Sequence, residues 1–324
     1  MKNPLLLPLI ALFVTLIVSC ATEEPANTPE PTLTAVPTAT TVPEPPFRVV
    51  AYTTASIVPE LIPYDRLTHI IYAFLIPNAD GTFAPLANTW KIKEIVTRGR
   101  EANVQVLIAV GGWGWDEQFE TMAANPEYRA TFVQNLSQFV DEYGLDGVDM
   151  DWEYPDPGQS GQNFLALIRE LRQAMPDITL TTAVVSYGGT GDGIVSDSFE
   201  LFDFVNVMTY DGPDHGTMTQ FTAGLDYWGQ RGLPPEKMVM GLPFYARPGE
   251  TIYRNIVAEN PQAAYTDTVE LNGAPIFYNG IPTVQTKTRL AMEQAGGIMF
   301  WTLDQDTLDE LSLLQAIDEV VNEP

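Results

Sequence analysis

Four carboxyl groups stand close together in the segment LDGVDMDWEYP, residues 145–155, which is otherwise apolar and typical of a β-strand. Side chains of a strand alternate between its two faces, so Asp149, Asp151 and Glu153 share one face, and Asp146 comes before them. Neighbours on one face are roughly 6.6 Å apart, close enough for carboxyl groups to share a proton or raise one another's pKa. A glutamate that ionises with difficulty can act as a general acid near neutral pH.

Hydrolysis of a glycosidic bond requires two carboxyl groups in different protonation states. One must be protonated to donate to the leaving oxygen, and the other must be ionised to stabilise positive charge at the anomeric carbon. The backbone spacing alone leaves open whether the anomeric configuration is retained or inverted. Asp146 and Asp149 could also serve only to brace the strand ends through hydrogen bonds.

A metal site is the main chemical alternative, because three carboxylates could hold Mg²⁺ or Ca²⁺ through their oxygens. A cation would keep all three ionised, however, and the neighbouring residues are apolar and aromatic rather than further ligands. The two histidines, His69 and His215, lie far apart in the chain and do not indicate zinc. We therefore expect neither a metal nor another cofactor.

Short apolar runs rich in β-branched residues supply the strands that would position this acidic face. There are eight of them: Arg48–Thr53, His69–Leu75, Val104–Val110, Gly147–Trp152, Ile178–Val185, Phe204–Met208, Met238–Phe244 and Gly297–Leu303. Between and after them lie stretches of helical periodicity, among them Pro126–Tyr143, Gln162–Met175 and Leu308–Val321.

Near-continuous apolar strands separated by helices indicate parallel strands that are buried on both faces. Eight of them within about 280 residues predict a (β/α)₈ TIM barrel, a single catalytic domain over residues 47–324. The alternative is a doubly wound open sheet, which would more often carry a glycine-rich dinucleotide loop after its first strand, and none follows Tyr52. In the barrel, Glu153 lies at the carboxyl end of the fourth strand, where barrel enzymes place their chemistry.

The first residues of the chain are typical of an export signal. Lys2 precedes an apolar run, Pro4–Val18, whose length of about 15 residues falls short of the roughly 20 that span a bilayer. The run ends in IVSC, which resembles the lipobox of bacterial lipoproteins, so we expect residues 1–20 to be a signal peptide and Cys20 to be acylated. An unmodified cysteine or an ordinary cleavage site is the alternative.

Residues 21–46 are rich in proline and threonine and have almost no large apolar side chain, which predicts a flexible, extended linker. We expect an exported protein, held at the cell surface or in the periplasm by a lipid on Cys20. Acidic residues outnumber basic ones 42 to 16, for a net charge of −26, which argues against nucleic acid and anionic membrane surfaces as partners. We expect a monomer.

At this point the domain resembles glycoside hydrolase family 18, the chitinase family. Its DxxDxDxE signature is met by Asp146, Asp149, Asp151 and Glu153. Further segments like those of the family follow in order along the strands: YAF (Tyr72–Phe74), AVGGW (Ala109–Trp113), MTYD (Met208–Asp211), GLPFYAR (Gly241–Arg247) and GGIMFWTLDQD (Gly296–Asp306). The family's third strand usually reads SxGG. Here Ala109 replaces the serine, so a hydrogen bond that supports Asp149 is either missing or supplied elsewhere.

The resemblance implies a retaining mechanism in which the substrate's own 2-acetamido carbonyl attacks the anomeric carbon. Glu153 would protonate the leaving oxygen and then activate water. Asp151 would hold the acetamido group and stabilise its positive charge, Asp149 would share a proton with Asp151, and Tyr210 would bond the acetamido carbonyl.

The resemblance also implies a sugar-binding cleft. Trp301 would form its apolar floor, since sugar faces present C–H groups that pack well on aromatic rings. Met208 and Asp211 would line the same subsite. Further candidates, for which packing in the barrel core is the alternative, are Tyr52, Phe74, Trp113, Trp115 and Tyr154. His215 could lie at the edge of the cleft, whereas His69 is interpreted as structural.

The stretch 248–295 must hold a helix, predicted at Val284–Gln294, and leaves too little room for the full α+β insertion that deepens the cleft in many family members. We therefore expect an open groove suited to internal cleavage of β-1,4-linked N-acetylglucosamine polymers, chitin or chitooligosaccharides. Alternatives are an endo-β-N-acetylglucosaminidase or peptidoglycan hydrolase on the same barrel, or a non-catalytic chitin-binding lectin.

Overall fold

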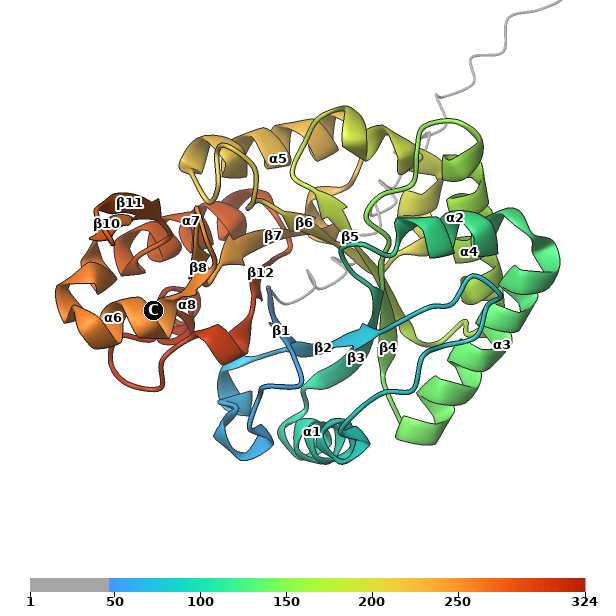
Figure 1. The fold of residues 1–324 in the computed structure, drawn as a ribbon, viewed down its shortest axis with the longest axis horizontal. Helices are drawn as coiled ribbons and strands as arrows, with labels where there is room; N and C mark the ends of the chain where they lie inside the picture. Colours follow the sequence, from blue (N-terminus) through green and yellow to red (C-terminus); the bar gives the residue numbers. More distant parts are fainter. Residues whose placement is uncertain (1–46, 324) are drawn as a thin grey trace, which may run out of the picture. The chain divides into compact units, whose positions relative to one another are not determined.

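The computed structural model describes residues 47–323; the predicted signal peptide, Cys20 and the linker lie outside the described residues. Eight parallel strands close into a barrel in the spatial order β1-β12-β7-β6-β5-β4-β3-β2 (Figure 1). They are β1 (Arg48–Thr53), β2 (His69–Leu75), β3 (Gln105–Gly111), β4 (Gly147–Asp151), β5 (Thr179–Val185), β6 (Phe204–Met208), β7 (Met238–Pro243) and β12 (Gly297–Trp301). This confirms the predicted TIM barrel, with each strand within two residues of its predicted ends.

The helices surround the barrel (Figure 1). They are α1 (Thr89–Ala102), α2 (Asp116–Ala124), α3 (Pro126–Tyr143), α4 (Gln159–Ala174), α5 (Met218–Gln230), α6 (Tyr253–Glu259), α7 (Ile281–Gln294) and α8 (Leu313–Val321). No helix within residues 47–323 is long and apolar enough to cross a membrane.

Local capping explains where α3 begins and ends. The side chain of Asn125 accepts a hydrogen bond from Glu127 N–H, and Pro126 occupies the first turn, where it disrupts no helical hydrogen bond. Gly144 ends the helix with a φ of 64°, a conformation that favours glycine. The structure confirms the predicted bounds of this helix.

The last helix begins later than the sequence predicts, at Leu313 rather than Leu308. The reason is the buried Asp306, whose carboxylate accepts hydrogen bonds from the backbone N–H groups of Leu313 and Leu314. Ser312 caps the helix by accepting from Gln315 N–H. These bonds hold the preceding residues in a loop and start the helix after it.

Between β7 and β12 the chain forms small elements rather than a further domain. Two two-stranded sheets are present, β8 (Tyr245–Ala246) with β9 (Thr251–Ile252), and β10 (Thr268–Leu271) with β11 (Ala274–Phe277). The remaining length is mainly α6 and α7. This agrees with the prediction that a full α+β insertion is absent from this segment.

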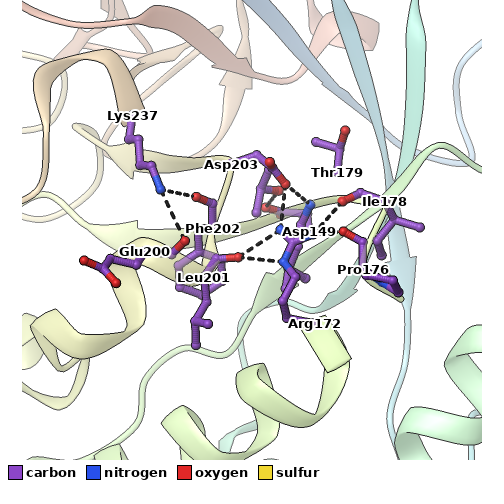
Figure 2. A network of polar contacts seen from close by, with 12 residues as sticks. Asp149, Arg172, Pro176, Ile178, Thr179, Glu200, Leu201, Phe202, Asp203 and Lys237 are labelled. Atoms are coloured by element: carbon purple, nitrogen blue, oxygen red, sulfur yellow. Dashed lines mark hydrogen bonds and ion pairs between the residues drawn. The ribbon is translucent and has the colours of Figure 1, made fainter. Parts of the chain in front are cut away.

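Polar side chains at the amino ends of the strands, half-buried or exposed, link neighbouring segments at the face opposite the acidic site. Arg172 of α4 donates to Asp203 Oδ2 at 2.7 Å and to the carbonyl of Leu201. Lys237 donates to the carbonyl of Phe202 at 2.6 Å. Figure 2 shows this network of contacts. At the start of β4, Asp146 accepts from Val106 N–H at 2.8 Å and so braces the strand, one of the two roles considered for it.

His69 begins β2 and is buried inside the barrel. Its Nδ1 lies 2.7 Å from Thr68 Oγ1, and its ring meets Phe204 edge-on at 5.0 Å between centroids. Burial lowers its pKa to about 4, so the ring is neutral near neutral pH. His69 is therefore a structural residue, as the sequence indicates.

Candidate active site

The carboxyl ends of the strands surround a cavity of about 660 Å³. Its lining includes every residue predicted for the site except Asp149, Trp115 and His215: Tyr52, Phe74, Trp113, Asp151, Glu153, Tyr154, Met208, Tyr210, Asp211 and Trp301. The sequence interpretation missed Ala183, Tyr245, Arg247, Glu250 and Gln305, which line the same cavity. Tyr245 and Arg247 belong to the GLPFYAR segment and Gln305 to GGIMFWTLDQD, so a signal for these three existed.

Asp149 lies beneath the cavity and is fully buried. Its carboxylate accepts three hydrogen bonds, from Tyr52 Oη at 2.7 Å, Thr181 Oγ1 at 2.5 Å and Asn206 Nδ2 at 3.1 Å. Burial raises the pKa of Asp149, and the three bonds oppose this rise. Ala109 pairs with Asp149 in the register of β3 and β4, so the support that a serine would give comes instead from β1, β5 and β6.

Asp151 is the next carboxyl group along the same face of β4 and is 3% exposed. Its Oδ1 atom is buried and has no hydrogen-bond partner within residues 47–323. Burial raises its pKa well above the ordinary value, and the negative charges of Glu153 and Asp149 raise it further. Asp151 therefore retains a proton to a higher pH than an ordinary aspartate does.

Glu153 follows the end of β4 and reaches the cavity. Burial raises its pKa, a hydrogen bond with Tyr154 opposes this, and the charge of Asp211 adds to the rise. The group therefore stays protonated to a higher pH than an ordinary glutamate, which is what a general acid requires.

Asp211 stands after β6 with a φ of 61°, a conformation that is uncommon for a residue with a side chain. Its backbone N–H donates to His215 Nδ1 at 3.0 Å, and its Oδ1 atom accepts from Tyr245 Oη and Arg247 Nε, both at 2.8 Å. His215 Nε2 lies 3.1 Å from the carbonyl of Tyr245, so a neutral ring satisfies both nitrogens. His215 is buried behind this loop and does not line the main cavity, contrary to the expectation that it edges that cleft.

Aromatic side chains form the floor and rim of the cavity. The ring of Trp301, at the end of β12, stacks on Phe74 at 5.4 Å between centroids and lies 5.6 Å from Tyr52. Trp113 is 79% exposed at the rim. Trp115, in contrast, packs against the core outside the barrel at the start of α2 and contributes nothing to the cavity.

Tyr210 is buried at the wall of the cavity, and among residues 47–323 its hydroxyl reaches only Met299 Sδ, at 3.8 Å. A weak contact of this kind leaves the hydroxyl able to donate to a ligand. Within the described part of the chain, no group of three or more His, Cys, Asp or Glu side chains is placed to hold a metal ion. The arrangement combines a proton donor, a buried carboxyl pair and an aromatic floor.

Comparisons with known proteins agree with this chemistry. Residues 48–306 match the family model described as "Glycosyl hydrolases family 18". The chain is 31% identical over 253 residues to a probable endochitinase of Caenorhabditis elegans, a match that covers 64% of this chain and 40% of the relative. It is 29% identical over 226 residues to probable chitinase 2 of Drosophila melanogaster, covering 57% and 46%. The matched region thus spans less than half the length of these two relatives.

Solved structures are similar over almost the whole barrel. A family 18 chitinase from the chitin utilization locus of Flavobacterium johnsoniae is 29% identical with a TM-score of 0.75, and the match covers 85% of this chain and 94% of that one. A chitinase of Bacteroides thetaiotaomicron is 25% identical with a TM-score of 0.78, covering 86% and 97%.

Proposed function

Because the chain belongs to glycosyl hydrolase family 18, we propose that it hydrolyses β-1,4-linked N-acetylglucosamine polymers, chitin or chitooligosaccharides. The observation that carries the proposal is the acidic row on β4, in which Glu153 reaches an aromatic-lined cavity and Asp151 lies buried beside it. The chitinases to which the chain is similar support the substrate class. Chitin is uncharged, so the net charge of −26 does not oppose its binding.

The proposed mechanism retains the anomeric configuration and uses no protein nucleophile. Glu153 donates its proton to the leaving oxygen as the glycosidic C–O bond breaks. The carbonyl oxygen of the substrate's acetamido group forms a bond to the anomeric carbon and gives an oxazolinium ion. Water, deprotonated by Glu153, then attacks the anomeric carbon and restores the acetamido group and the proton on Glu153.

The surroundings of Asp151 support its part in this mechanism. A buried carboxyl oxygen without a partner is costly, and the N–H of a bound acetamido group would supply the missing donor. As positive charge develops on that group, Asp151 ionises and its proton passes to Asp149, the carboxylate with which it shares the face of β4. Tyr210, whose hydroxyl has only a weak contact, donates to the acetamido carbonyl.

Other substrates that carry the same sugar are the main alternatives: N-glycan cores for an endo-β-N-acetylglucosaminidase, and peptidoglycan. The discriminating experiment gives the purified protein an N-acetylglucosamine hexamer, purified peptidoglycan and an N-glycosylated protein in parallel, and identifies the products by mass spectrometry. We expect shortened oligomers from the hexamer at the highest rate. Faster release from peptidoglycan or glycoprotein would reassign the substrate, and binding of the hexamer without release from any of the three would identify a chitin-binding lectin.

We further propose that Cys20 is acylated and anchors an exported protein at the cell surface or in the periplasm, with residues 21–46 as a linker. The IVSC sequence and the apolar run before it support this. In a bacterial host fed an alkyne fatty acid, the wild type and Ser19→Ala should incorporate label and sediment with membranes, whereas Cys20→Ala should do neither. Label retained by Cys20→Ala would overturn the proposal.

A further inference from the structure

A second cavity, of about 590 Å³, adjoins the candidate active site. It is lined by the loop after β6 between residues 212 and 217, by residues 247–249, and by Phe277 at the end of β11. Arg247 lines both cavities, so the two are neighbours that share one side chain as a wall. A ligand that extends beyond the active site on this side enters the second cavity.

Phe277 is a large aromatic side chain that is 51% exposed, whereas Ile276 before it is buried. Two backbone hydrogen bonds fix its position: Arg247 N–H donates to the carbonyl of Phe277 at 2.9 Å, and Phe277 N–H donates to the carbonyl of Arg247 at 2.7 Å. The short hairpin of β10 and β11 therefore holds an exposed ring directly beside the residue that separates the cavities. An isolated exposed aromatic is ordinary, but one that is fixed at the wall of a cavity next to a binding site is a candidate for ligand contact.

The charges around this cavity favour a neutral ligand. The guanidinium of Arg247 is already paired, through Nε with Asp211 at 2.8 Å and through Nη1 with Glu250 at 2.9 Å. His215 is neutral in its hydrogen-bonding pattern, and burial lowers its pKa. The rest of the lining is mainly proline, glycine and the Phe277 ring. Gly212 and Gly249 face open space, since a Cβ built at either position would meet no atom within 4 Å.

We propose that this cavity is a further sugar subsite, in which Phe277 stacks on an N-acetylglucosamine unit of the same polymer that occupies the active site. The inference rests on the proposed function for the identity of the sugar. A pyranose ring presents a flat face of C–H groups to the aromatic ring and keeps its hydroxyl groups at the edge, toward water. The β10–β11 hairpin thereby makes binding depend on the length of the polymer.

Binding measured by calorimetry tests this in the Glu153→Gln background, where the ligand stays intact. The ligands are the N-acetylglucosamine hexamer and trimer, and the added changes are Phe277→Ala, Phe277→Trp and Tyr265→Ala. Tyr265 is the matched control, because it lies in the same segment between β7 and β12, is 55% exposed and lines neither cavity.

We expect Phe277→Ala to weaken hexamer binding by about 3- to 10-fold, with a smaller effect on the trimer. Phe277→Trp should retain the hexamer affinity within about 2-fold, since it preserves an aromatic face, and Tyr265→Ala should leave both affinities unchanged. An unchanged hexamer affinity in Phe277→Ala, an equal loss for both oligomers, or an equal loss in Phe277→Trp would overturn the subsite. Turnover of the hexamer by the otherwise unchanged protein is a separate result: its absence would defeat the proposed function, while the binding comparison would still decide the subsite.

Discussion

The hydroxyl of Tyr52 on β1 donates a 2.7 Å hydrogen bond to Asp149 on β4, across the interior of the barrel. Thr181 and Asn206 donate to the other oxygen of the same carboxylate. Asp151 receives no comparable support, and one of its oxygens is unpaired within residues 47–323. The barrel therefore stabilises negative charge on Asp149 and favours a proton on Asp151 in the absence of substrate.

Removal of the Tyr52 hydroxyl should slow catalysis without unfolding the barrel. Tyr52→Phe deletes one donor to Asp149, so the pKa of Asp149 rises. Asp149 then tends to carry a proton before substrate binds, and it cannot take up the proton that Asp151 releases. A hydrogen bond to a charged group contributes about 1.5–3 kcal/mol, so we expect kcat to fall by about 10- to 100-fold. Steady-state kinetics on the N-acetylglucosamine hexamer measures this.

Tyr72→Phe is the matched control for this change. Tyr72 is equally buried on the neighbouring strand β2, but its hydroxyl has no hydrogen-bond partner in the described part of the chain. The variant should keep wild-type kcat. Equal loss in both variants would mean that any lost tyrosine hydroxyl damages the barrel, and the proposed role of Tyr52 would be abandoned.

Asp151→Asn should lose at least about 100-fold in kcat, because the amide cannot take up negative charge as the acetamido group becomes positive. The same mechanism predicts that a fully deacetylated hexamer is not cleaved, since it lacks the attacking carbonyl. Product analysis by mass spectrometry measures both. Ready cleavage of the deacetylated hexamer would instead indicate a protein nucleophile.

The alkaline limb of the pH profile should depend on Asp211. Glu153 must be protonated to act, and the negative charge of Asp211 contributes to its raised pKa. Asp211→Asn removes that negative charge and the ion pair between Asp211 and Arg247. The pKa of Glu153 therefore falls, and the alkaline limb of kcat/KM moves to lower pH by about 1 unit or less.

Asp214→Asn is the control for this shift. Asp214 lies in the same loop as Asp211 but does not line the main cavity. Its carboxylate accepts a hydrogen bond from Tyr187 Oη at 3.0 Å. Its pH profile should match that of the wild type. A shift of the Asp211→Asn limb to higher pH, or no shift, would contradict the electrostatic role given to Asp211.

Lys287 of α7 should make the free energy of unfolding depend on pH. It is fully buried, and its Nζ donates to the carbonyl of Gly216 at 2.6 Å and to Asn279 Oδ1 at 2.8 Å. Burial lowers its pKa from 10.5 to about 7. Between these values the unfolded chain binds more protons than the folded one, so the free energy of unfolding rises with pH.

Relative to Lys287→Met, the wild type should therefore gain up to about 1.4 kcal/mol of stability per pH unit between pH 7 and pH 10. Urea unfolding at several pH values measures the free energy of unfolding of the two proteins. Lys93→Met, at an exposed position of α1, is the comparison variant. If the difference in free energy of unfolding between Lys287→Met and the wild type stays constant over this range, the pKa of Lys287 is not lowered in the folded protein.

The strands could be predicted because parallel strands buried on both faces appear in sequence as continuous apolar runs, which these eight are. The row of acidic residues on β4 follows from the two-residue period of a strand. The helix α8 was misplaced because its start depends on the carboxylate of Asp306, a capping contact that hydrophobic periodicity does not reveal.

Side-chain partners across strands were harder to predict. Arg247 joins the site through an ion pair with Asp211 that forms only when β6 and β7 lie side by side. Trp113 and Trp115 are two positions apart in one loop, and nothing in the sequence indicates that the first lies at the rim while the second packs on the outer core. Whether the groove favours internal cleavage stays a prediction.

The most direct test of the proposed chemistry compares the wild type with Glu153→Gln on the N-acetylglucosamine hexamer. Products are followed by mass spectrometry, and binding of the intact hexamer is measured for the variant. We predict dimers and trimers from the wild type alone, with the variant still binding the hexamer. Appreciable turnover by Glu153→Gln, or an intact hexamer in both samples, would contradict the account.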